Sequence, residues 1–408
     1  MTREEKTIVT LTSFGHALTH SYLLVYPAVL LLLQKEFSLG FLGLGLVGGL
    51  ATLAYGVGAL PGGVLCDWLG PRRLLLVCFL GSALTSLMIA LSSSFSLFAV
   101  GITLLGFFGS VYHPMANVLL TSRVKEMGKA IGIHGAAGNI GLALTPSIAA
   151  VIASRWGWRT VYLLAVLPGL FISLGAFFVN MSLPQKDPRL TPQPRSLSRI
   201  GLLCAVPLLL IYCINGLNGF CNLGVMTFLP AYIAEKARFP LFSMSNMVIG
   251  GTLSSIVLFL GLFGQYAGGM RTQGRHHERS ILVAAAMSLP LVLAMSITDN
   301  VILLLAACGY FFLNFAIQPM TNVALALYAP LGMRGTAFGV FFSTGFGVAA
   351  LAPAFAGYLA EQFGMSALFF GMAAGVLLMV FSAIFLVRYA PGRMNRSKTK
   401  ATVLPKSR

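Results

Sequence analysis

The chain has 408 residues, of which 57% are hydrophobic and only 9% are charged. A soluble fold of this size has too little interior to hide so much apolar surface, so the composition excludes a soluble domain. The formal net charge of +17 would suit a nucleic-acid partner. The basic residues follow membrane topology instead, and we expect a lipid bilayer and no nucleic acid as the partner of this chain.

Apolar runs near or above the roughly 20 residues that cross a bilayer as a helix recur along the whole chain. They predict an all-α integral membrane protein with twelve transmembrane helices. The predicted spans are 8–33, 41–66, 74–92, 95–122, 130–153, 160–182, 201–234, 243–267, 281–297, 301–329, 336–360 and 365–388.

The distribution of basic residues predicts the topology of these spans. With a cytoplasmic N-terminus, the outside loops hold only a few of the 27 Lys and Arg residues, namely Lys35, Arg155, Arg159, Lys236 and Arg238. This asymmetry is the positive-inside rule. We therefore expect a multi-pass protein of a bacterial cytoplasmic (inner) membrane with both termini in the cytoplasm.

Ionisable side chains inside a membrane are costly, so they are the first candidates for function. No carboxylate, Lys or Arg falls at the middle of a predicted span, which leaves histidine. His16 and His20 in the first span are four residues apart and share one helix face. In the fourth span His113 precedes Pro114, which loosens a helix, and Asn117 lies one turn further on. We predict that His16, His20, His113 and Asn117 bind the substrate.

Glycine recurs at every third position in the fifth span, at Gly132, Gly135, Gly138 and Gly141. The run contains a weak phosphate-loop spacing but follows no strand, so it predicts close helix packing and not a dinucleotide site. His134 lies in the same segment. We expect no cofactor.

The polar segment 183–200 is rich in Pro and Arg and predicts a cytoplasmic linker. It separates an N-terminal bundle, 1–182, from a C-terminal bundle, 201–390, which a basic cytoplasmic tail follows at 391–408. The fragment YHPMANV at 112–118 has its counterpart in IQPMTNV at 317–323. Such repetition predicts two pseudo-symmetric six-helix bundles.

Six plus six helices in parallel repeats resemble the major facilitator superfamily over the full length of the chain. The loop between the second and third spans supports the resemblance, since GVLCDWLGPRR at 63–73 is similar to the loop signature of that family. The resemblance implies that Asp67 faces a helix N-terminus of the opposite half, where the helix dipole favours a carboxylate. It would act in a conformational latch, whose expected members are Gly63, Asp67, Gly70, Arg72 and Arg73. Trp68 and Pro71 stand where the family usually has basic residues.

Within the superfamily, two fragments resemble the fosmidomycin-resistance type of drug exporter. They are Gly15-His16 with Ser21-Tyr22 in the first span and GSVYHP at 109–114 in the fourth. That type usually carries an acidic residue after the His-Pro pair, where this chain has Met115. The resemblance implies efflux of a small organic compound.

Amide side chains form stripes in two further spans. Asn215, Asn218 and Asn222 follow helical spacing in the seventh span, and Asn314, Gln318 and Asn322 do so in the tenth. The resemblance implies that the first, fourth, seventh and tenth spans line a central cavity. We therefore predict substrate binding by Asn218, Asn222, Asn314, Gln318 and Asn322. The alternative is that these amides only hold helices together by hydrogen bonds.

These features predict a secondary transporter that works by alternating access and moves a small organic solute or drug, with efflux favoured. No GxxxxGK[ST] loop is present to bind a nucleotide, so an ion or solute gradient is expected to supply the energy. If protons couple, the expected carriers are His20 and His113, because the unperturbed pKa of histidine is about 6.5. We expect a monomer.

Two alternatives stay open at this point. One is transport of a transition-metal ion such as iron by the N-terminal histidines, since imidazole is a common metal ligand. The other is a receptor or scaffold that does not transport. An intramembrane enzyme is not expected, because histidines without carboxylates form no acid–base pair at depth.

Overall fold

The computed structural model describes residues 1–182, 202–237, 245–271, 277–329 and 334–389, except for a few side chains within these ranges. This part of the chain folds into thirteen α-helices. They are α1 (Arg3–Phe37), α2 (Phe41–Ala90), α3 (Phe95–Ser110), α4 (Tyr112–Arg123), α5 (Met127–Trp156), α6 (Trp158–Phe178), α7 (Leu202–Lys236), α8 (Asn246–Arg271), α9 (His277–Ile297), α10 (Asn300–Tyr328), α11 (Arg334–Ala349), α12 (Ala352–Phe363) and α13 (Ala367–Tyr389).

In the described residues these helices supply twelve spans of membrane length, which confirms the predicted all-α membrane fold. Helix α2 supplies two spans, Phe41–Ala59 and Trp68–Ala90. Helix α2 kinks at Gly70, near the start of the second span, where the φ of 78° is a backbone conformation that glycine adopts without strain. Helices α3 and α4 together form one span, and α11 and α12 form another.

The broken spans differ between the two halves. In the first half the chain breaks between α3 and α4 at Val111, three residues before Pro114. The counterpart Pro319 lies inside the continuous helix α10. In the second half the break separates α11 from α12 just before Pro353, whereas Pro146 lies inside the continuous helix α5. The halves therefore repeat in sequence but differ in where the helices break. In the first half the fourth span is interrupted near its proline, and in the second half the eleventh span is interrupted, which corresponds to the fifth.

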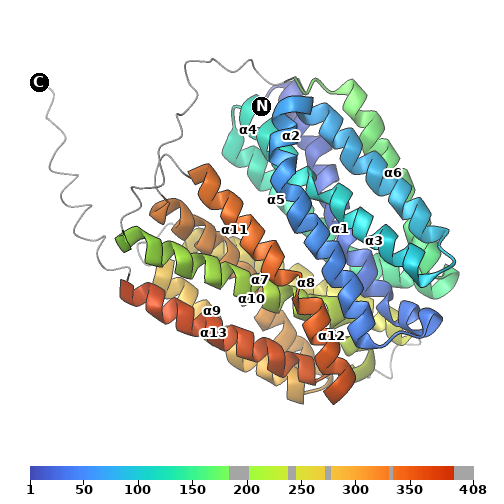
Figure 1. The fold of residues 1–408 in the computed structure, drawn as a ribbon, viewed down its shortest axis with the longest axis vertical. Coiled ribbons are helices and arrows are strands. Elements are labelled where there is room, and N and C mark those ends of the chain that lie inside the picture. Colours follow the sequence, from blue (N-terminus) through green and yellow to red (C-terminus); the bar gives the residue numbers. More distant parts are fainter. Residues whose placement is uncertain (183–201, 238–244, 272–276, 330–333, 390–408) are drawn as a thin grey trace, which may run out of the picture.

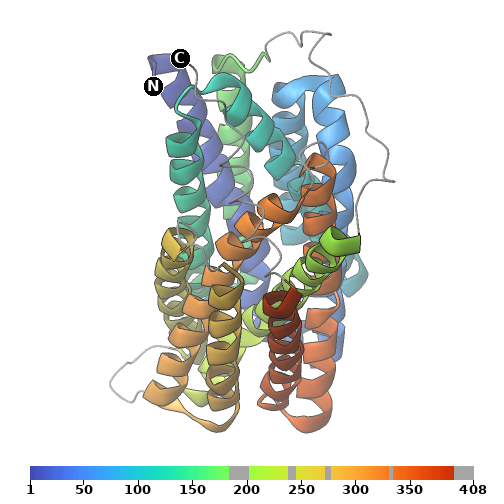
Figure 2. The same cartoon turned by 90° about the vertical axis from the view of Figure 1, so that its left-hand side faces the viewer.

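Helices α1–α6 gather in one bundle and α7–α13 in a second (Figure 1). Packing is extensive within each bundle, as between α1 and α5 and between α8 and α10. The bundles meet chiefly where α5 packs on α8 and where α2 packs on α11 and α12. Figure 2 shows the same bundles from the side. The predicted linker 183–200 and tail 391–408 lie outside the described residues.

The two halves touch most closely on one side of the bundle. We call the side where α1 begins and α13 ends the terminal side, and the other the far side. On the far side a Cβ added at Gly45 of α2 would lie 2.0 Å from the carbonyl oxygen of Pro353. The Ser147 amide of α5 donates to Ser255 Oγ of α8 at 2.9 Å, also toward the far side. Glycine and small residues thus bring helices of opposite halves together there.

Candidate functional site

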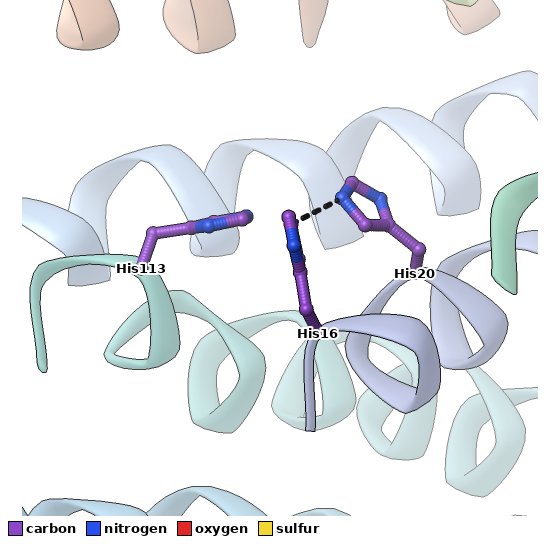
Figure 3. A group of neighbouring side chains, drawn as sticks. All are labelled: His16, His20 and His113. Atoms are coloured by element: carbon purple, nitrogen blue, oxygen red, sulfur yellow. Dashed lines mark hydrogen bonds between the residues drawn. The ribbon is translucent and has the colours of Figure 1, made fainter. Parts of the chain in front are cut away.

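Three of the predicted site residues meet in the N-terminal half. His16 and His20 come from successive turns of α1, and His113 comes from the first turn of α4, directly after the break. Figure 3 shows the three rings turned toward one another. One ring nitrogen of each lies within 4.8 Å of the others. We call these three residues the histidine cluster.

The ring of His16 lies against α5 because that helix has no side chain at the point of contact. A Cβ added at Gly138 would lie 2.4 Å from the His16 ring, and one at Gly141 would lie 2.1 Å from the Ala17 carbonyl oxygen. The close packing predicted for the glycine run is found at these two positions. Beside Gly132 and Gly135 the space is open.

The orientation of His16 is fixed from α5. His16 Nδ1 lies 2.7 Å from the backbone carbonyl oxygen of His134, and the two rings stack at 4.1 Å with 15° between their planes. The His134 Nε2 in turn lies 3.1 Å from the hydroxyl of Tyr112, which donates its own proton to the Thr12 carbonyl oxygen. His134 and Tyr112 are buried and belong to the support of the cluster.

When each ring is neutral, these contacts assign the protons of His16, His20 and His134. A carbonyl oxygen only accepts, so His16 Nδ1 carries a hydrogen and, in the neutral ring, His16 Nε2 is an acceptor. His20 Nε2 lies 3.0 Å from His16 Nε2 and must therefore donate to it. The Tyr112 hydroxyl already donates its hydrogen to the Thr12 carbonyl oxygen, so His134 Nε2 donates to the Tyr112 oxygen. With one hydrogen on each ring, His16, His20 and His134 satisfy all of these contacts.

The amides of the C-terminal half form a second polar group. Asn314 Nδ2 of α10 donates to Asn218 Oδ1 of α7 at 3.0 Å. The side-chain oxygens of Asn222, Asn314 and Asn322 are buried without a hydrogen-bond partner. We call Asn218, Asn222, Asn314 and Asn322 the amide set. An unpaired buried acceptor costs about 1–3 kcal/mol, so each of these three oxygens is a position at which a donor would be favourable.

Other predicted residues are not part of these groups. Asn117 and Gln318 have exposed side chains on α4 and α10. Asn215 donates to the Phe341 carbonyl oxygen at 2.7 Å, so this member of the stripe in α7 holds α11. The stripe of α7 therefore divides between helix packing and the amide set.

Two arginines of the expected latch, Arg72 and Arg73, lie in the described part of the loop signature. The surroundings of Gly63 and of the Asp67 side chain lie outside the described part of the chain, and the role of Asp67 stays a prediction. Arg72 Nη2 donates to the Val179 carbonyl oxygen at the end of α6, at 3.0 Å, and so binds within its own half. Arg73 is exposed.

A carboxylate does meet a helix N-terminus of the opposite half, at another place. Glu361 Oε2 at the end of α12 accepts a hydrogen bond from the Leu42 amide in the first turn of α2, at 2.9 Å. Gly40, the N-cap of α2, offers no side chain to do so. The contact lies on the far side and combines a cap with a favourable helix dipole.

The sequence pattern does not predict the part played by Tyr112 and by the His134 carbonyl group. Both follow from the packing of α4 and α5 against α1, which helical periodicity within one span does not encode. Tyr112 stands beside His113 in the repeated fragment, and the glycine run around His134 marks a helix that can approach closely. These two signals could have drawn attention to the residues.

Comparison with known proteins agrees with this architecture. The model of the Major Facilitator Superfamily matches residues 9–352. The chain belongs to this superfamily. It is 25% identical over 372 residues to the cis,cis-muconate transport protein of Acinetobacter baylyi, covering 87% of each chain. It is 27% identical over 377 residues to the probable sulfoacetate transporter of Cupriavidus necator, covering 85% of each chain.

A third similarity covers less of the chain. It is to an Escherichia coli multidrug resistance protein, at 28% identity over 165 residues and 40% of each chain. Among solved structures, the inward-facing, unoccupied bacterial homologue of the lysosomal transporter Spinster superposes with a TM-score of 0.78 at 15% identity, over 95% of this chain and 97% of that one. The fold and the relatives identify a multi-pass membrane transporter.

Proposed function

We propose that this superfamily member is a secondary transporter that moves a small organic solute between the histidine cluster and the amide set. The observation that carries the proposal is that the buried amide oxygens of Asn222, Asn314 and Asn322, on α7 and α10, have no hydrogen-bond partner. Polar atoms left unpaired inside a membrane are costly, and a solute that brings hydroxyl or N–H donors would satisfy them.

The position of the two groups supports alternating access. The histidine cluster belongs to α1 and α4, the amide set belongs to α7 and α10, and α1 also contacts α7. A solute held by both groups would link the halves, so its binding would depend on how the halves are placed. The far-side contacts of α2 with α12 and of α5 with α8 suit a state that opens toward the terminal side. With the predicted topology, that side is the cytoplasm.

The relatives suggest which solutes to try first. Two that match most of the chain are named for muconate and sulfoacetate, which are small organic acids, and a partial match is named for drug resistance. We keep efflux as the proposed direction, from the sequence resemblance to drug exporters. Proton coupling through His20 and His113 stays a prediction, as does the monomeric state.

The test is counterflow in proteoliposomes with muconate, sulfoacetate and fosmidomycin as labelled probes, measured in both directions. Replacing Asn222 or Asn322 by Ala should lower the uptake of the transported probe by roughly tenfold, which corresponds to one lost hydrogen bond of about 1.4 kcal/mol. Asn246→Ala, at the exposed start of α8, is the matched control and should leave uptake unchanged. Equal uptake in all three variants would contradict the proposed site.

A further inference from the structure

The histidine cluster has the donor geometry of a metal site. His16 Nε2 and His20 Nε2 lie 3.0 Å apart. Two nitrogen ligands of one tetrahedral ion, each at 2.0–2.1 Å from the metal, lie about 3.3 Å apart. The pair on α1 is therefore already near ligand spacing. A ring nitrogen of His113 lies within 4.8 Å of both, so a small rotation of its side chain would complete three ligands (Figure 3).

The support around His16 is of the kind that metal-bound histidines have. A ligating histidine almost always donates its other ring N–H to a carbonyl or carboxylate oxygen, which fixes the ring and its tautomer. His16 Nδ1 donates to the His134 carbonyl oxygen at 2.7 Å, and this leaves the lone pair of Nε2 directed at His20. The backbone of α5 supplies the acceptor, so its position does not depend on a side-chain rotamer of α5.

His134 itself is outside the ligand set. Its ring stacks on His16, and its Nε2 donates to Tyr112. His20 needs only a change of tautomer to become a ligand, since its proton can move from Nε2 to Nδ1. The cluster remains neutral in that step. Three neutral imidazoles suit zinc, copper, nickel or ferrous iron, whereas magnesium and calcium prefer oxygen ligands.

We propose that His16, His20 and His113 bind one divalent transition-metal ion, with a fourth position left for water or an anion. All three ligands belong to the N-terminal half, so the ion does not tie the two halves together. The inference goes beyond solute transport and does not require it. If the transported solute also binds the histidine cluster, the ion and the solute would compete for the same ring nitrogens.

The experiment uses the purified full-length protein in detergent, without a polyhistidine tag and stripped of metal with a chelator. Isothermal titration with Zn²⁺ and visible absorption with Co²⁺ measure binding in the absence of any solute. We expect one ion per chain, a tetrahedral Co²⁺ spectrum, and a rise in Tm with Zn²⁺. His16→Gln, His20→Gln and His113→Gln should each weaken binding by at least about tenfold.

Two further variants make the result decisive. His20→Cys keeps a zinc ligand at the same place and should retain most of the affinity that His20→Ala loses. The double variant His276→Gln/His277→Gln removes the neighbouring histidines near the start of α9 and should bind as the unmodified protein does. Absence of binding in the unmodified protein, an octahedral Co²⁺ spectrum, or loss of binding only in the double variant would overturn the proposal. Any of these would leave the proposed transport of an organic solute untouched, because flux is measured separately.

Discussion

The ring of Tyr55 in α2 lies 5.2 Å from the ring of Phe346 in α11, measured between centroids, so an aromatic contact joins the two halves. The same Tyr55 ring lies 6.1 Å from the ring of His113. Tyr55 therefore connects the histidine cluster with the opposite half of the transporter.

This contact predicts that transport depends on the ring of Tyr55 and not on its hydroxyl. The hydroxyl is buried without a partner, so Tyr55→Phe should retain transport. Tyr55→Ala removes the ring that contacts both His113 and Phe346, and large-to-small changes of buried aromatics cost about 3–5 kcal/mol. We expect a fall in the maximal counterflow rate of at least about tenfold. Equal losses in both variants would contradict this account and assign a role to the hydroxyl.

A second prediction concerns Gly138, which lets His16 lie against α5. A Cβ at this position would lie 2.4 Å from the His16 ring, so Gly138→Ala must displace the ring from its place in the cluster. Over-packing of this kind costs about 1–3 kcal/mol, and a lower Tm together with loss of Zn²⁺ binding is the expected result.

Gly135→Ala is the matched control for Gly138→Ala. It is one turn away in the same helix and has open space around the added Cβ. It should leave Zn²⁺ affinity and Tm unchanged or slightly raised, because alanine favours the helix over glycine. If both substitutions had the same effect on Zn²⁺ affinity, packing against His16 would not be the cause.

A third prediction concerns the far side. Glu361 caps the N-terminus of α2 across the two halves, so Glu361→Ala should weaken their contact by about 1 kcal/mol and raise the population that opens there roughly fivefold. Distances between spin labels at Ser38 and Phe363 would measure this population. Glu235→Gln, an exposed carboxylate at the end of α7, should not change it. An unchanged distance distribution in Glu361→Ala would exclude a gating role for the contact.

A fourth prediction concerns the hydrogen bond between Asn314 and Asn218. Asn218→Leu leaves the Asn314 amide without its acceptor and should lower the free energy of unfolding by about 1–3 kcal/mol. The double variant Asn218→Leu/Asn314→Leu should be more stable than Asn218→Leu alone, because no unpaired partner then remains. Thermal unfolding in detergent measures both, and strictly additive losses would contradict a direct interaction.

Much of the fold follows from the sequence. The twelve spans are set by the length of the apolar runs, which is a local property, and all twelve occur in the described residues. The position of the breaks does not follow so simply. Pro114 and Pro319 are equivalent in the repeat, yet only the span of Pro114 is interrupted. Proline loosens a helix, and the packing of each half decides whether the helix ends.

The site is predictable to a smaller extent. Helical spacing places His16 and His20 on one face, and their meeting with His113 was expected from the resemblance to a superfamily in which the first and fourth spans line the centre. The same spacing also predicts Asn117 and Gln318, whose side chains are exposed and make no contact with either polar group, so their part in binding stays a prediction. Periodicity gives the face of a helix, but the depth and the neighbour of each side chain depend on how separate helices pack.

The most direct test of the proposed transport is whether solute flux depends on His20 and His113. We would measure counterflow of the organic probes in proteoliposomes that hold the unmodified protein, His20→Ala, His113→Ala or the control His277→Ala. We expect flux in the unmodified protein and in His277→Ala, and loss of most of it in His20→Ala and His113→Ala. Full flux in both cluster variants would contradict a solute site at the histidine cluster.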